Sequence, residues 1–255
     1  MGTSASYGTP SGGEWSSVKR QITATLGGGN TAATPATIVG GTTSASGGLS
    51  YAGGAGGAAA TSGRNRIAGA IAGIGGFGAA VRDGGLDSAL SGLGLDTLRG
   101  RPAAEVVSAI SEYLAREAEG LDREFLQTAF SEALLEAASL GDDLGYEDFA
   151  TGLEEFLAAQ GAEGLVELFL DHFVFDTLWG RIEQHAVFKS SDDAALESLM
   201  TAIQGECVAQ VREQMDAARN DGSFATADWF GRAGQELGMR IVSELEARLS
   251  ALRET

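Results

Sequence analysis

The sequence predicts an all-α protein: a multi-helix domain preceded by a flexible N-terminal region rich in glycine, serine and threonine. From Pro102 onward, apolar side chains recur every three or four residues, which is the period of one face of an α-helix. No segment in this part alternates in the manner of a strand rich in Val, Ile and Thr. Residues 165–186 are apolar nearly all round, which is typical of a helix at the centre of a domain.

The first 63 residues are expected to form a flexible tail with short helical segments and a linker. Three apolar residues near its start lie at helical spacing: Trp15, Val18 and Ile22. Thr34 followed by Pro35 is a typical helix start, because threonine caps a helix and proline fits its first turn. The helix that follows is expected to be weak, since it is rich in Gly, Thr and Ser. Residues 47–63 have the composition of a flexible linker.

The helical domain is expected to span residues 64–255. Its first helix is rich in glycine, carries an apolar stripe and breaks at Gly84-Gly85. The next two helices begin at Pro102 and Asp122, because proline favours the first turn of a helix and aspartate its cap. Four further segments have the helical period: 146–157, 165–186, the stretch from 191 to a turn at 220–222, and 226–252.

The formal net charge of the 255 residues is −18, and residues 1–63 contain only three charged side chains. An acidic body repels phosphate, so we expect no direct binding to nucleic acid. A single cysteine, Cys207, excludes a disulfide framework and a thiolate metal cluster. The nearest approach to a membrane span, residues 67–81, is shorter than the roughly 20 residues of a spanning helix, and no signal-peptide pattern is present. We therefore expect a cytoplasmic protein.

One group of side chains has the composition of a catalytic or metal site: Glu167, Asp171 and His172. However, His172 shares the apolar stripe of its helix and has no second histidine four residues further on. A hydrogen-bonded core histidine is therefore the favoured interpretation, and Cys207, also on an apolar face, is typical of a structural cysteine. We expect no catalytic residue, no metal site and no cofactor. A metal-dependent hydrolase built on this group is an alternative.

The stretch before Gly13 is small and uncharged, and Tyr7 is its single aromatic residue. Removal of Met1 would expose the amine of Gly2, which has no β-carbon and, as an α-amine, a pKa near 7.7–8.0. Five further residues are expected to bind a partner: Thr3, Ser4, Ser6, Tyr7 and Gly8. A plain disordered end is one alternative. N-myristoylation at Gly2 is another, disfavoured because a polybasic second signal is missing.

This stretch, MGTSASYGTPSGG, resembles the start of the QatB family of Qat anti-phage defence cassettes. The likeness continues in four short segments: 14–20, 92–95, 100–102 and 130–134. The resemblance implies a non-enzymatic subunit encoded beside an ATPase, a TatD-like nuclease and an enzyme resembling those that make 7-deazaguanine bases (QueC-like). It also implies that Gly2 is the acceptor that the QueC-like enzyme modifies. The alternative is a helical structural or oligomerising protein that uses an exposed small-residue helix near residues 67–81 and the last helix as contact faces.

Overall fold

The structure is a computed structural model that describes residues 12–27, 33–50, 57–139, 145–224 and 228–254. Within these residues all regular structure is helical and no strand is present, which confirms the predicted all-α fold. The elements are α1 (Gly13–Leu26), α2 (Pro35–Ser46), α3 (Gly57–Gly92), η1 (Asp96–Leu98), α4 (Ala103–Leu114), α5 (Gly120–Ala137), α6 (Tyr146–Lys189), α7 (Asp193–Asn220), α8 (Arg232–Ala251) and η2 (Leu252–Glu254).

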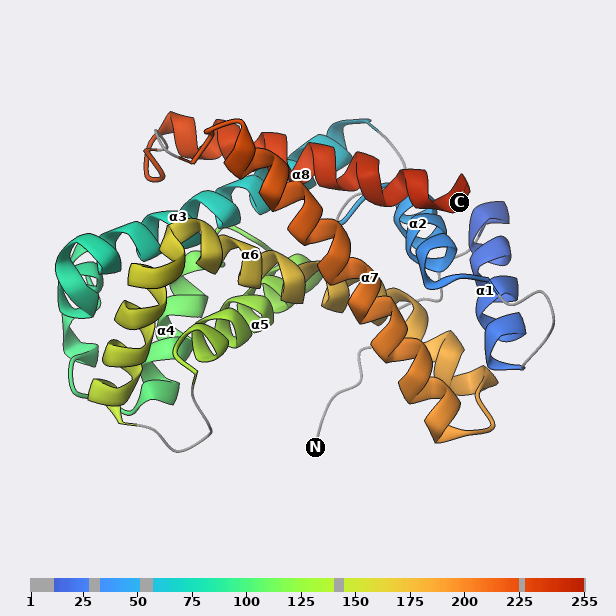
Figure 1. The fold of residues 1–255 in the computed structure, drawn as a ribbon, viewed down its shortest axis with the longest axis horizontal. Helices are drawn as coiled ribbons and strands as arrows, with labels where there is room; N and C mark the ends of the chain where they lie inside the picture. The colour runs from blue at the N-terminus through green and yellow to red at the C-terminus, as the bar shows by residue number, and fades with distance from the viewer. Residues whose placement is uncertain (1–11, 28–32, 51–56, 140–144, 225–227, 255) are drawn as a thin grey trace.

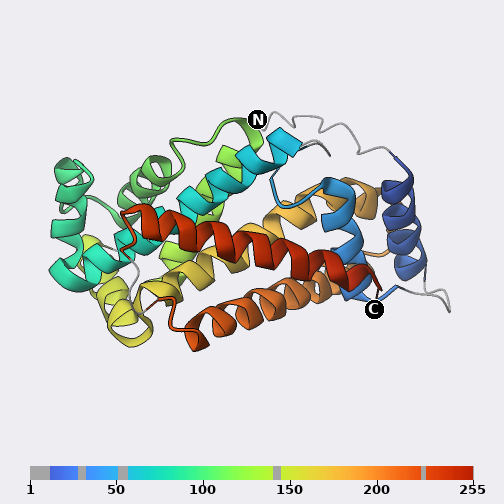
Figure 2. The same ribbon diagram turned by 90° about the horizontal axis from the view of Figure 1, so that it is seen from above.

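Helix α6 is the element around which the others are arranged (Figure 1). It packs against α3 and α5 on one side and against α7 and α1 on another. Helix α8 lies across the molecule and contacts both α3 and α7 (Figure 2). Over the described ranges, none of the helices combines the length and hydropathy that crossing a bilayer requires.

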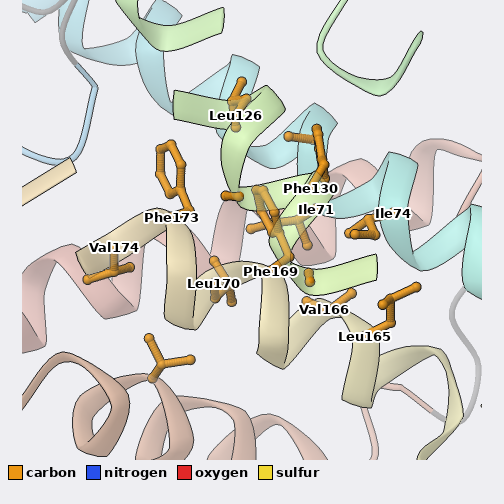
Figure 3. Packing of buried hydrophobic residues seen from close by; sticks show 14 of the residues in the cluster. Ile71, Ile74, Leu126, Phe130, Leu165, Val166, Phe169, Leu170, Phe173 and Val174 are labelled. Atoms are coloured by element: carbon orange, nitrogen blue, oxygen red, sulfur yellow. The ribbon is translucent and has the colours of Figure 1, made fainter. Parts of the chain in front are cut away.

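Buried apolar side chains surround Phe169 in the second half of α6 (Figure 3). Its ring stacks on Phe130 of α5, with the ring centroids 4.5 Å apart, and on Phe173 one turn further along α6, at 5.7 Å. Ile71 and Ile74 of α3 belong to the same cluster. The prediction that residues 165–186 form the central helix is confirmed, because this segment is buried by α3, α5 and α7 together.

Two of the long helices are bent at glycines that adopt positive φ. In α3 the bend is at Gly85, with φ 78°, as the sequence predicts for Gly84-Gly85. In α6 it is at Gly161, with φ 69°. The predicted helices 146–157 and 165–186 are therefore the two arms of α6, joined by a residue whose conformation favours glycine.

Helices α1 and α2 belong to the same core as the rest of the protein. Trp15, Val18 and Ile22 are buried, and the side chain of Thr34 accepts a hydrogen bond from the backbone N–H of Thr37 at 3.2 Å, which confirms the predicted cap. The structure differs from the expected weakness of α2. A β-carbon at Gly40 would lie 2.3 Å from the backbone nitrogen of Arg253, so this glycine lets η2 pack directly on α2.

The expected cap at Asp122 is wrong, because the N-cap of α5 is Glu119. Asp122 lies in the first turn, is only 4% exposed, and binds across the fold instead. It accepts a hydrogen bond from Ser50 Oγ at 2.8 Å and pairs with Arg66 of α3 at 3.1 Å. The carboxylate of Asp122 thus fixes the segment after α2 against α3 and α5.

A second buried carboxylate, Glu246 of α8, holds the same segment. It accepts the backbone N–H of Leu49 at 2.8 Å and pairs with Arg64 at 2.5 Å. Arg181 of α6 donates to the carbonyl oxygens of Gly48 and Ser50 at 2.7 and 3.0 Å. Residues 48–50, which lie within the region expected to be a linker, are therefore bound by charged groups of α8 and α6.

Replacing Glu246 by glutamine is expected to lower the free energy of unfolding by about 2 kcal/mol, because a charged acceptor of two hydrogen bonds is lost from a buried site. Urea denaturation measures the change. The matched control is Glu236→Gln on the same helix, whose pair with Arg232 is solvent-exposed and should matter little. Equal effects of the two substitutions would show that Glu246 does not anchor this segment.

Candidate functional site

The predicted modification site Gly2 and the predicted partner-binding residues Thr3, Ser4, Ser6, Tyr7 and Gly8 lie outside the described residues. The helix that follows them, α1, is held on α6 by His185. The imidazole Nε2 lies 3.1 Å from the carbonyl oxygen of Lys19 and 3.2 Å from Thr23 Oγ1. Burial lowers the pKa of His185, the hydrogen bond to the Lys19 carbonyl opposes this shift, and the charges of Lys19 and Lys189 add to it.

The described residues that sequence analysis singled out for chemistry gather at a hollow between α5, α6 and α7. Its volume is about 480 Å³. The second arm of α6 supplies Glu167, Leu168, Asp171 and His172, which share one face because they repeat at four-residue spacing. The remaining walls come from α5, the first arm of α6 and α7: Glu136, Phe156, Ala159, Gln160, Gln204, Val208 and Arg212.

His172 is clamped between two carboxylates of α5. Its Nδ1 lies 3.0 Å from Glu132 and its Nε2 lies 2.9 Å from Glu136, and these glutamates are one helical turn apart. The histidine thus joins α6 to α5, a contact that sequence analysis missed because the glutamates lie more than thirty residues away and share no motif with it.

Glu167 is paired with α7. Its carboxylate accepts a hydrogen bond from Arg219, and Arg212 Nε lies 3.9 Å away. Arg219 in turn pairs with Asp216 at 2.9 Å. Two arginines of the facing helix therefore engage the carboxylate of Glu167.

Asp171 lies between these two sets of ion pairs. Its Oδ1 is buried and accepts no hydrogen bond from the described residues. Burial raises the pKa of Asp171 to about 7, and the nearby charges of Glu167 and Glu136 add to the rise, while Arg212 opposes it. Burial, followed by the charge of Glu132, also raises the pKa of Asp176 to about 6. Asp171 therefore exchanges a proton near neutral pH.

The three residues of the metal-site alternative are engaged separately: Glu167 with α7, His172 with α5, and Asp171 with neither. In the part of the chain that the structure describes, no three or more His, Cys, Asp and Glu side chains are placed to hold a metal ion. Cys207 is fully buried on the apolar face of α7, and burial strongly raises the pKa of its thiol. It is a packed thiol on the inner face of its helix.

The family model for QatB, described as "Qat anti-phage system associated protein QatB", matches residues 53–243, which is more than half of the chain. The chain belongs to the QatB family. It is therefore a protein associated with the Qat anti-phage system. No curated protein and no solved structure is significantly similar to it. The matched residues include every residue of the hollow and begin after α2, so the N-terminal stretch lies outside the match.

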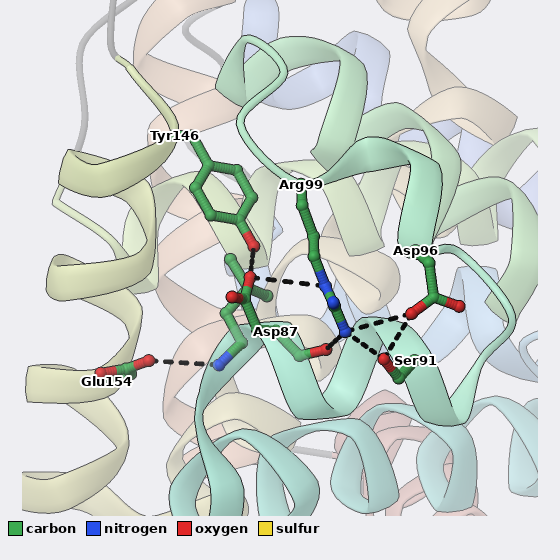
Figure 4. Close-up of polar contacts among 7 residues, drawn as sticks. Asp87, Ser91, Asp96, Arg99, Tyr146 and Glu154 are labelled. Carbon is green, nitrogen blue, oxygen red and sulfur yellow. Dashed lines mark hydrogen bonds and ion pairs between the residues drawn. The ribbon is translucent and has the colours of Figure 1, made fainter.

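In this QatB family member, the basic residues of the segment 64–101 pair with carboxylates, and two of these pairs, Arg64–Glu246 and Arg66–Asp122, join α3 to α8 and α5. Each of the five arginines contacts a carboxylate. Figure 4 shows the network around Arg99, which pairs with Asp96 at 3.1 Å and donates to the carbonyl oxygen of Asp87 at 3.0 Å. The hydroxyl of Tyr146, at the start of α6, donates to the Asp87 carboxylate. Arg99 and Tyr146 thus join η1 and α6 to the end of α3 through Asp87.

The expected contact face near residues 67–81 is wrong, because this part of α3 is buried by α6 and α8. Gly238 of α8 approaches so closely that a β-carbon there would lie 2.5 Å from the carbonyl oxygen of Ala68. The exposed large apolar residues among those described lie elsewhere: Val187 and Phe188 at the end of α6, and Phe230 before α8. The small residues of α3 therefore serve internal packing.

The raised pKa values predict that stability falls as pH rises. In the unfolded chain an aspartate ionises near 3.9, so the protonated carboxyls of Asp171 and Asp176 stabilise the fold fully below about pH 4. This contribution is lost as pH rises through 6 and 7. The free energy of unfolding should therefore decrease between pH 5 and pH 8. The substitution Asp171→Asn should make this decrease smaller by an amount on the order of 2 kcal/mol, allowing for solvent screening.

Urea denaturation at a series of pH values measures this slope. Asp193→Asn, in the exposed first turn of α7, is the matched control and should keep the wild-type slope. If the variant Asp171→Asn also showed the wild-type slope of stability against pH, the pKa of Asp171 would be that of an ordinary surface carboxylate.

Proposed function

We propose that this QatB family member is a non-enzymatic accessory subunit of the Qat complex that presents Gly2 for modification by the QueC-like enzyme of the same cassette. The ATPase and the TatD-like nuclease are the further partners that the family implies. The observation that carries the proposal is the family match over residues 53–243, joined to the Met-Gly start that resembles the family's N-terminus.

The chemistry of Gly2 supports its role as an acceptor. A free α-amine is partly unprotonated at neutral pH, whereas a lysine amine, with a pKa near 10.4, is almost wholly protonated. The chain contains 17 basic residues, of which only Lys19 and Lys189 are lysines. Few competing amines are therefore present, and the absence of a β-carbon lets an activated donor approach Gly2 closely.

The anchoring of α1 supports the proposed presentation of the N-terminus. His185 and the buried residues of α1 fix this helix on the body, so the polypeptide before Gly13 leaves the protein from a defined place. A stretch the length of residues 1–11 spans at most about 40 Å when extended. A partner that binds within this reach of α1 has access to Gly2 while the helical body keeps its conformation.

Co-purification tests the proposed partnership. The chain is tagged at its C-terminus and expressed together with the other genes of the cassette. We expect the QueC-like enzyme to elute with the wild-type chain and to be reduced with Tyr7→Ala, because an aromatic side chain is the strongest anchor that the N-terminal stretch offers. Separate elution of the QueC-like enzyme from the wild-type chain would contradict the proposal.

A further inference from the structure

We propose that the hollow between α5, α6 and α7 binds a ligand that carries an amidinium or guanidinium group on an apolar or aromatic body. This inference is independent of the role of Gly2. It rests on one acceptor, Asp171, and on the walls that surround it.

The first step concerns which group of the hollow is available. The imidazole of His172 is occupied by Glu132 and Glu136, and the carboxylate of Glu167 by Arg219. These ion pairs fix the rim of the hollow. Asp171 lines the same hollow, and its buried Oδ1 accepts no hydrogen bond from the described residues. A buried acceptor without a donor is costly, so the hollow is suited to a ligand that supplies one.

The second step concerns the charge of that donor. Asp171 faces Glu167 on its own helix, Glu136 on α5, and Arg212 and Cys207 on α7. The two glutamates disfavour its ionised form, and Arg212 only partly offsets them. A planar cation would relieve this repulsion, and it would form two parallel hydrogen bonds with the carboxylate of Asp171. Binding therefore ionises Asp171 and releases its proton.

The third step concerns the body of the ligand. Phe156, Leu168 and Val208 give the hollow an apolar wall, and the amides of Gln160 and Gln204 add polar groups at its edge. Gly164 also lines the hollow, and a β-carbon there would lie 2.6 Å from the β-carbon of Gln160. A volume of about 480 Å³ admits an aromatic ring together with its cationic group.

Isothermal titration calorimetry of the full chain tests the proposal with two probes. One is benzamidine, a small aromatic amidinium, and the other is the capped dipeptide acetyl-Phe-Arg-amide. Titrations in two buffers of different ionisation enthalpy count the protons released. We expect proton release on binding at pH 6.5, little release at pH 8.5, and affinity that rises between these values, because Asp171 must be ionised to bind.

The variant Asp171→Asn should bind about tenfold more weakly, or worse, and release no proton. The matched control Asp193→Asn should bind as the wild type does. Binding of both probes would show that the hollow recognises the cationic group, whichever molecule carries it. Binding of the dipeptide alone would assign it to an arginine side chain of a partner, and binding of benzamidine alone to a small molecule. No binding by either probe, or full binding by Asp171→Asn, would overturn the proposal.

Discussion

Replacing Phe169 by alanine is expected to lower the free energy of unfolding by about 3–5 kcal/mol, the usual loss for a buried aromatic side chain. Phe169 is fully buried, and its ring contacts Phe130 and Phe173 in the cluster where α3, α5 and α6 meet. The substitution removes apolar contacts from three helices and leaves a cavity that close packing around α6 prevents from collapsing. Urea denaturation monitored by circular dichroism measures the loss.

The matched control is Phe188→Ala, at the end of the same helix, where the ring is 78% exposed. Its removal should change stability little, because most of its surface already faces solvent. A loss below about 1 kcal/mol for Phe169→Ala would show that this part of α6 is not the structural centre.

Replacing Gly2 by glutamate is expected to abolish phage defence while the fold stays intact. A large side chain after Met1 hinders removal of the initiator, and a β-carbon with a carboxylate blocks approach of an activated donor to the amine. Plaque counts on cells that carry the whole cassette should equal those on cells without it. The thermal unfolding of the purified variant should match that of the wild type, since residue 2 precedes every helix of the body.

Gly13→Glu is the matched control for this experiment. A β-carbon at Gly13 would meet nothing within 4 Å, and an acidic residue in the first turn of a helix is favourable. This variant should therefore protect cells as well as the wild type does. Full protection by Gly2→Glu would contradict the role proposed for the N-terminus.

The helices of the second half of the chain are predictable from sequence because their apolar side chains repeat with the helical period. Helix α2 is predicted only as a weak helix, and its burial is not predictable in this way, because two of its buried residues are threonines. Their hydroxyls donate to carbonyl oxygens one turn earlier, Thr42 to Ile38 at 2.7 Å and Thr43 to Val39 at 3.0 Å. Each hydroxyl is satisfied within the helix, so a helix rich in Gly, Thr and Ser is compatible with burial.

The hollow is only partly predictable for a different reason. The spacing of Glu167, Asp171 and His172 places them on one helix face, and the sequence shows this directly. Their partners come from α5 and α7, and which helices face α6 depends on the bend at Gly161 and on tertiary packing. The protonation state of Asp171 depends on those partners, since burial and the charges of Glu167 and Glu136 raise its pKa. Local spacing therefore identifies the residues, and the fold decides their chemistry.

The mass of the N-terminal tryptic peptide tests the proposed function most directly. Lys19 is the first basic residue, so trypsin releases residues 2–19 from a chain that has lost Met1. When the chain is purified from cells that express the whole cassette, we predict a peptide heavier than its unmodified form, with fragment ions that place the added mass on Gly2. Deletion of the QueC-like gene should restore the unmodified mass. An unmodified peptide from the complete cassette, or one that retains Met1, would contradict the account.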